Sequence, residues 1–320
     1  MQSREQHSER SIAVWGAPAS GKTTFLAALQ IALAKQEPDW RVIGADAESE
    51  QGLVRLTDLL AAGGTFPLAT GDIQHYRWAL VGPVQRDGRR WWFGRTRQGE
   101  NIKIELDLID APGSMAVPGS QVQGDLIENL AKSRAIVFLY DPIREFETGD
   151  VFHNTSAVLT ELSQRISVPD GKLPHYVAVC ITKFDEVRVH AAAEKLDLLV
   201  TDPEPPGFPR VANEHAREFF LELSNVSRTG EARLIPNLLE RIFHPDRIRY
   251  FVTSAIGFYV DPETGTYRPE DFQNHIPGPQ GSRIRGSIRP INVVEPLLWL
   301  SERMAAQAES TKAEELSCSV

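Results

Sequence analysis

The chain has 320 residues, 42% of them hydrophobic, and a formal net charge of −9 at pH 7. This length allows one large or two smaller domains, and the negative charge disfavours nonspecific binding to nucleic acid or to an anionic membrane. Two distant cysteines, Cys180 and Cys318, indicate neither a disulfide framework nor a metal knuckle, which fits the cytoplasm. No apolar run reaches the roughly 20 residues of a membrane span.

The first half of the chain predicts strands and helices that follow one another closely. Apolar runs and helical spacing give the elements in chain order: a strand at 11–15, helices at 21–34 and 47–62, a Gly- and Pro-rich loop at 61–72, and antiparallel strands within 75–109. The first ten residues, which are polar and lack the apolar centre of a signal peptide, are expected to be disordered.

The second half continues the alternation. It predicts helices near 121–132 and 155–166, strands at 135–142, 176–185 and 248–257, a largely helical stretch at 186–245 with a Pro-rich break at 201–210, an irregular loop at 258–290, a closing helix at 291–307 and a tail at 309–320. Alternating strands and helices predict a three-layer α/β fold with a mostly parallel central sheet. Ligands of such sheets bind at the carboxyl ends of the strands.

Residues 16–23 read GAPASGKT, which fits the phosphate-binding pattern G-x-x-x-x-G-K-[ST] between a strand and a helix. Its glycines allow backbone amides to point at phosphate oxygens, beside the positive end of the following helix. Lys22 should reach the β- and γ-phosphates, and the hydroxyl of Thr23 should bind Mg²⁺. The candidate phosphate-binding residues here are Gly16, Ala19, Ser20, Gly21, Lys22, Thr23 and Thr24.

The next apolar strand ends at Asp110, and Gly113 completes the pattern D-x-x-G. A carboxylate at this point can hold the Mg²⁺ shell. The amide of Gly113 can contact a γ-phosphate, so the loop could sense whether that phosphate is present. Many ordinary turns also contain D-x-x-G.

Two further strands end in patterns that point to a guanine base. Residues 182–185 read TKFD, in which Asp185 can accept hydrogen bonds from guanine N1–H and the 2-amino group, whereas adenine offers neither donor. The aliphatic stem of Lys183 can cover the base plane. An aspartate here could instead cap a helix. A backbone amide of the Ser254-Ala255 pair could meet guanine O6. The candidate guanine-binding residues are Thr182, Lys183, Asp185, Ser254, Ala255 and Ile256.

These four motifs, in this order, resemble those of Ras-like P-loop GTPases of the translation-factor-related class over roughly residues 11–307. The resemblance implies a single GTPase domain over 11–308, a Mg²⁺ cofactor, GTP or GDP as ligand, and a protein effector or activating protein. The loop GGTFPLATGD is similar to that of bacterial GTPases encoded as paired genes. Long spacings between the motifs imply insertions at about 36–62, 83–101, 186–245 and 258–290.

The resemblance also implies a switch I threonine that completes the Mg²⁺ shell and acts in catalysis together with Lys22. Thr70 and Thr65 are the candidates, and Thr70 is preferred because it directly precedes the expected strand. Ser114 follows the D-x-x-G pattern, where Ras-like members often place a glutamine that orients water. Slow hydrolysis is therefore expected, although Gln121 and Gln123 lie further along.

Three functions stay open: a GTPase switch, a GTP-sensing module with little hydrolysis, or a P-loop ATPase or kinase in which TKFD is incidental.

Residues 86–97 combine arginines with Trp91, Trp92 and Phe93. That hairpin could bind nucleic acid or a protein, or simply pack on the sheet. The stretch 282–290 is a second basic segment. The histidines lack metal-ligand spacing, and a G-x-S-x-G serine elbow is absent from the sequence.

Overall fold

The computed structural model describes most of the chain. The described residues are 11–36, 39–61, 64–67, 74–83, 101–110, 120–166, 168, 170–225, 228–277 and 282–318. Within these ranges, the side chains at 36, 83, 101–102, 109–110 and 311–318 are not described.

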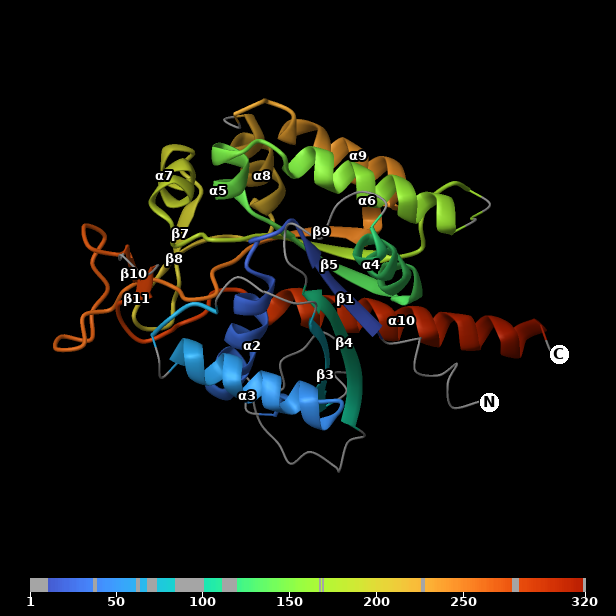
Figure 1. Cartoon of the computed structure of the whole chain (residues 1–320), viewed down its shortest axis with the longest axis horizontal. Coiled ribbons are helices and arrows are strands. Elements are labelled where there is room, and N and C mark those ends of the chain that lie inside the picture. The colour runs from blue at the N-terminus through green and yellow to red at the C-terminus, as the bar shows by residue number, and fades with distance from the viewer. Residues whose placement is uncertain are drawn as a thin grey trace.

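A seven-stranded sheet in the order β2-β3-β4-β1-β5-β6-β9 forms the centre of the molecule (Figure 1). The five strands from β4 to β9 run parallel, whereas β2 and β3 form an antiparallel edge. The bounds are β1 Ser11–Gly16, β2 Arg41–Gly44, β3 Gln74–Pro83, β4 Asn101–Asp110, β5 Ala135–Tyr140, β6 Tyr176–Ile181 and β9 Ile248–Val252. The expected α/β class with a mostly parallel central sheet is confirmed.

Helices cover both faces of the sheet, which makes three layers (Figure 1). One face carries α2 (Lys22–Gln36), α3 (Ala47–Ala61) and α10 (Glu295–Cys318). The other carries α4 (Gln121–Lys132), α5 (Pro142–Glu147), α6 (Val151–Arg165), α7 (Val187–Lys195), α8 (Ala216–Asn225) and α9 (Ile235–Ile242).

Alternation along the strands divides the apolar side chains between two cores. Ile12 and Val14 of β1 pack with the α2 and α10 side, whereas Ala13 and Trp15 pack with the α4 and α6 side. Because successive side chains of a strand point to opposite faces, a strand buried on both faces must be apolar throughout. The continuous apolar runs of β1 and β5 meet that requirement.

Several elements differ from the sequence predictions. The Pro-rich break contains a two-stranded pair, β7 (Leu199–Thr201) with β8 (Pro209–Val211), and the segment 258–290 contains β10 (His275–Ile276) paired with β11 (Arg283–Ile284). These strands are too short for an alternating pattern to reveal them. Short 3₁₀ turns lie at Ala232–Leu234 and Pro245–Arg247.

Helix α10 continues to Cys318, through the stretch that was expected to be a tail. That stretch contains three glutamates and single Lys, Ala and Leu residues, all of which favour helices. No described helix has both the length and the apolar character needed to cross a bilayer. The parallel strands all end at one edge of the sheet, so the loops that follow β1, β5, β6 and β9 share that edge.

Candidate functional site

The loop between β1 and α2 has the backbone conformation of a phosphate cradle. Gly21 has φ +89° and Ala19 has φ +61°, so two residues adopt the left-handed region that gives the loop its tight curl. Gly16 must be a glycine, because a Cβ atom there would lie 2.6 Å from the backbone oxygen of Leu139 on the neighbouring strand. The loop leads directly into the amino end of α2, where backbone N–H groups and the helix dipole favour an anion.

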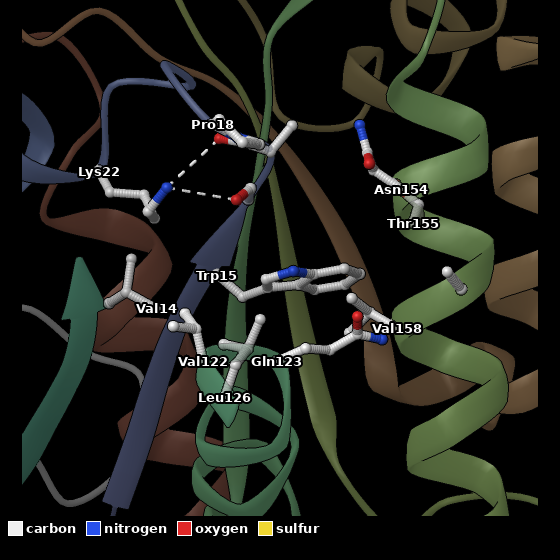
Figure 2. A pocket seen from close by; sticks show the side chains of 13 residues that line it. Val14, Trp15, Pro18, Lys22, Val122, Gln123, Leu126, Asn154, Thr155 and Val158 are labelled. Atoms are coloured by element: carbon white, nitrogen blue, oxygen red, sulfur yellow. Dashed lines mark hydrogen bonds between the residues drawn. The ribbon is translucent and has the colours of Figure 1, made fainter. Parts of the chain in front are cut away.

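The amine of Lys22 lies over this loop (Figure 2). Its Nζ donates to the carbonyl oxygens of Gly16 and Ala17 at 3.3 Å each. A small hollow of about 80 Å³ lies beside it, between β1, α4 and α6, and Trp15 forms much of its wall. Of the predicted phosphate residues, Gly16 and Lys22 line this hollow.

A larger cavity, of about 430 Å³, joins the phosphate loop to the loops after β6 and β9. Four predicted phosphate residues line it: Ala19, Ser20, Gly21 and Thr24. Five predicted guanine residues line it too: Thr182, Lys183, Asp185, Ala255 and Ile256. Segments far apart in the sequence therefore meet in one cavity, at the edge of the sheet where the parallel strands end.

Asp185 lines this cavity from the loop after β6 and is only 6% exposed. Its Oδ1 accepts a hydrogen bond from the hydroxyl of Ser254, whose own Oγ accepts from the Gly257 N–H at 2.8 Å. Burial raises the pKa of Asp185, and the Ser254 hydrogen bond only partly opposes that rise. No charged group of the described residues lies at hydrogen-bond distance from this buried carboxylate, which suits a ligand that brings two N–H donors.

Ser254 itself is not among the residues that line the cavity, and it contacts Asp185 from behind the cavity wall through its hydroxyl. Its backbone N–H donates to the carbonyl of Ile291 at 3.0 Å, and Ile291 N–H returns a bond to Ser254. The amide of Ser254 is therefore occupied. Of the Ser254-Ala255 pair, the amide of Ala255 is the one left as the candidate donor to a base oxygen.

Lys183 adopts φ +61°, unusual for a residue with a side chain. Its Nζ forms an ion pair at 2.6 Å with Asp141, the N-cap of α5, whose side chain is 1% exposed. The ammonium is thus held at Asp141, directly after β5, and Lys183 lines the cavity.

The residues predicted to hold Mg²⁺ fit a hard cation as far as they are described. Thr23 lies in the first turn of α2, and Asp110 ends β4. In the β1–β4 register Val14 is opposite Leu108, so the backbone of Asp110 ends beside Gly16 at the same edge. Thr and Asp are residue types whose side chains offer the oxygen donors that Mg²⁺ prefers. Thr70 and Gly113 lie outside the described residues, and Thr65 forms a bridge with Arg283.

The other sequence candidates have separate outcomes. The amide of Gln121 donates to Asp125 and that of Gln123 to Glu161, both at 2.8 Å, and neither side chain lines the larger cavity. The basic segment 282–290 is partly neutralised, because Arg285 forms a two-pronged ion pair with Asp271. Ser114 and the aromatic hairpin at 86–97 lie outside the described residues.

Sequence reasoning missed several cavity residues: Phe66, Ile143, Glu186, Arg188, His275 and Ser282. The sequence could have indicated Phe66, because the one aromatic side chain in the loop at 61–72 needs an apolar surface to pack against. Ile143 follows an Asp-Pro pair, a signal for a helix start. His275 reaches the cavity through the fold of 258–290, and the sequence carries no signal for that.

No protein-family model and no curated protein matches this sequence. Solved structures do resemble it. The small GTPase Arl6 (BBS3) of Trypanosoma brucei, solved with a bound nucleotide analogue, is 13% identical with a TM-score of 0.40, over 93% of this chain and 98% of that one. Nucleolar GTP-binding protein 1 of Plasmodium falciparum is 12% identical with a TM-score of 0.39, over 97% and 94%.

A signal recognition particle receptor complex from Chaetomium thermophilum is 15% identical with a TM-score of 0.36, over 78% of this chain and 91% of that one. Likenesses of this size do not by themselves say what the chain binds. The fold is a three-layer α/β fold with a mostly parallel sheet, and the case for a ligand depends on the cavity.

Proposed function

We propose that this protein is a guanine-nucleotide-binding switch that binds Mg²⁺-GTP, hydrolyses it slowly to GDP and phosphate, and regulates a protein partner. One observation carries the proposal: a single cavity is lined by the phosphate loop and by the buried Asp185. The strands β1 and β6, which present these two features, are separated only by β5, a spacing of about 9–10 Å. Backbone amides and a carboxylate that far apart complement the phosphates and the ring edge of one guanine nucleotide.

Each predicted residue then has a defined role. Lys22 would leave the Gly16 and Ala17 carbonyls to bind the β- and γ-phosphates and to stabilise charge during in-line attack by water. Thr23, Asp110 and Thr70 would hold Mg²⁺, which neutralises phosphate charge when bound, and Gly113 would sense the γ-phosphate. Asp185 would select guanine over adenine.

Slow hydrolysis is supported by the two glutamines after D-x-x-G, whose amides are engaged by Asp125 and Glu161. A GTP-sensing module without significant turnover is the second candidate, favoured by Ser114 in the position after D-x-x-G. We also propose that the protein acts in the cytoplasm and that its inserted segments carry partner contacts, as surface insertions commonly do.

The nucleotide that co-purifies with the full chain tests the proposal. Chromatography of the denatured protein should release GDP or GTP, and release of ADP or ATP would support the P-loop ATPase instead. Phosphate release from bound GTP, with and without cell extract, separates the two guanine-binding candidates. A slow rate accelerated by extract supports the switch, and no turnover in either condition supports the sensing module.

A further inference from the structure

Helix α5 contacts both halves of the candidate nucleotide site, and no sequence motif includes it. It follows β5, the strand between the one that ends in the phosphate loop and the one that ends in TKFD. Asp141 caps its amino end by accepting from the N–H groups of Ile143 and Arg144, at 3.0 and 3.2 Å. The cap fixes where the first turn of α5 lies relative to both loops.

On the base side, Asp141 holds Lys183. One carboxylate oxygen caps the helix, and the other pairs with Lys183 Nζ at 2.6 Å. The Asp141 side chain is 1% exposed and that of Lys183 is 37% exposed. Since a buried carboxylate strongly favours a charged partner, this pair holds the TKFD loop in the conformation with φ +61° at Lys183, two residues before Asp185.

On the phosphate side, Arg144 holds the loop after β1. Its Nη1 donates to the backbone oxygen of Pro18 at 3.1 Å. Its Nε and Nη2 form a two-pronged ion pair with Asp150 at 2.8 and 2.6 Å, and Thr148 also donates to Asp150. The ion pair with Asp150 therefore fixes the orientation of the guanidinium that donates to Pro18.

The direction of the Pro18 carbonyl matters because of the peptide plane. In a trans peptide the C=O of one residue and the N–H of the next point in opposite directions. With the Pro18 oxygen directed at Arg144, the Ala19 N–H must point away from it, and Ala19 lines the cavity. Ala19 is also the non-glycine residue of the loop with a positive φ, so its orientation depends on outside support.

We propose that α5 is a strut between the two halves of the nucleotide site, with Asp141 as the positioning residue for the base loop and Arg144 as the positioning residue for the phosphate loop. This inference deepens the proposed function and depends on it. Neither residue needs to touch the nucleotide. The two act on different parts of the ligand, so their effects are separable with nucleotides that differ by one phosphate.

The experiment measures displacement of a fluorescent GDP analogue from the full chain by GDP and by GMP. Arg144→Met keeps the apolar stem and removes the donors. We expect GDP affinity to fall about tenfold, the size of one charge-assisted hydrogen bond, with GMP affinity changed less than about twofold because GMP lacks the β-phosphate that loop amides bind. Asp141→Asn keeps the helix cap and should weaken GDP and GMP by the same factor, about tenfold.

Arg217→Gln is the matched control. Arg217 forms an ion pair with Glu240 at 2.6 Å between α8 and α9, outside the cavity lining, and its loss should leave both affinities unchanged. If Arg144→Met does not fold, as judged by thermal unfolding, Asp150→Asn retains the arginine and removes only its anchor, and the same selective loss of GDP affinity is expected.

An Arg144→Met protein that binds GDP like the wild type, or that loses GDP and GMP equally, overturns the phosphate half of the strut. If Asp141→Asn binds GDP and GMP with unchanged affinity, the proposed role of Asp141 in positioning the base loop is overturned. A wild-type chain that binds neither nucleotide contradicts the proposed function itself, which makes that failure distinguishable from failure of the strut.

Discussion

The hydroxyl of Ser254 donates to Oδ1 of Asp185 across 69 positions of the chain. This bond orients a buried carboxylate toward the cavity that also contains the phosphate loop. Ser254 Oγ accepts in turn from the Gly257 amide, so the hydroxyl hydrogen of Ser254 is the one donated to Asp185. The relationship ties the third and fourth motifs of the sequence into one unit.

Replacing Asp185 by Asn should weaken GDP binding and at the same time stabilise the nucleotide-free protein. The amide keeps the bond from Ser254 but offers a donor where guanine N1–H also donates, so GDP affinity should fall about 10- to 100-fold and the preference should shift toward xanthine nucleotides. The nucleotide-free protein should become more stable, because an unmatched buried charge is removed, with Tm rising by about 2–4 °C. Binding titrations and thermal unfolding measure the two effects. Retained guanine preference would remove Asp185 from the site.

The affinity for GDP should depend on pH through the same carboxylate. Burial raises the pKa of Asp185 above its ordinary value, and guanine donors require the ionised form. Affinity should therefore be constant above the raised pKa and fall as pH drops through it, by about tenfold per pH unit. Without nucleotide the native state binds this proton more tightly than the unfolded chain, so the contribution of Asp185 to stability declines as pH rises through that window. A similar acid dependence in Asp185→Asn would assign it to another group.

Ser254→Ala tests the orienting bond. Its loss removes the interaction that partly opposes the raised pKa of Asp185, so the acid limb of GDP binding should move to higher pH. At neutral pH the affinity should fall about 10- to 100-fold, the size of one hydrogen bond to a charged group. Titrations of GDP across pH measure both effects. An unmoved acid limb contradicts the assigned role of Ser254.

Lys22→Ala should lower the affinity for GDP and GTP by about 100-fold or more, because a charge-assisted contact to phosphate is lost inside a cavity. The fold should persist, since α2 remains buried on its apolar side through residues such as Leu26 and Leu29. Equilibrium binding and far-ultraviolet circular dichroism check the two statements. Full nucleotide affinity in this variant would mean that the phosphate loop is not the binding element.

Much of the fold was predictable because the signals are local. The apolar run of β1 and the helical spacing of Leu26, Leu29 and Leu33 give a strand and a helix on either side of the phosphate loop. The motifs stand at strand ends, and parallel strands bring their ends to one edge. The convergence of Ala19, Lys183 and Asp185 on one cavity follows from that rule.

The unpredicted parts depend on contacts between distant residues. Helix α5 has 6 residues, too few for a periodic pattern, and the pairing of its cap Asp141 with Lys183 spans 42 positions. His275 reaches the cavity because the segment around it folds back, with the N–H of Ile284 donating to the carbonyl of Gly64. Neither contact leaves a pattern in the local sequence.

The most direct test of the central claim is isothermal titration of the nucleotide-free full chain with GDP and with ADP, in the presence of Mg²⁺. Asp185 at the base end of the cavity predicts that GDP binds at least about 100-fold more tightly than ADP. Equal affinities for the two nucleotides would contradict the claim, because they would mean that the cavity binds the phosphates without distinguishing guanine from adenine.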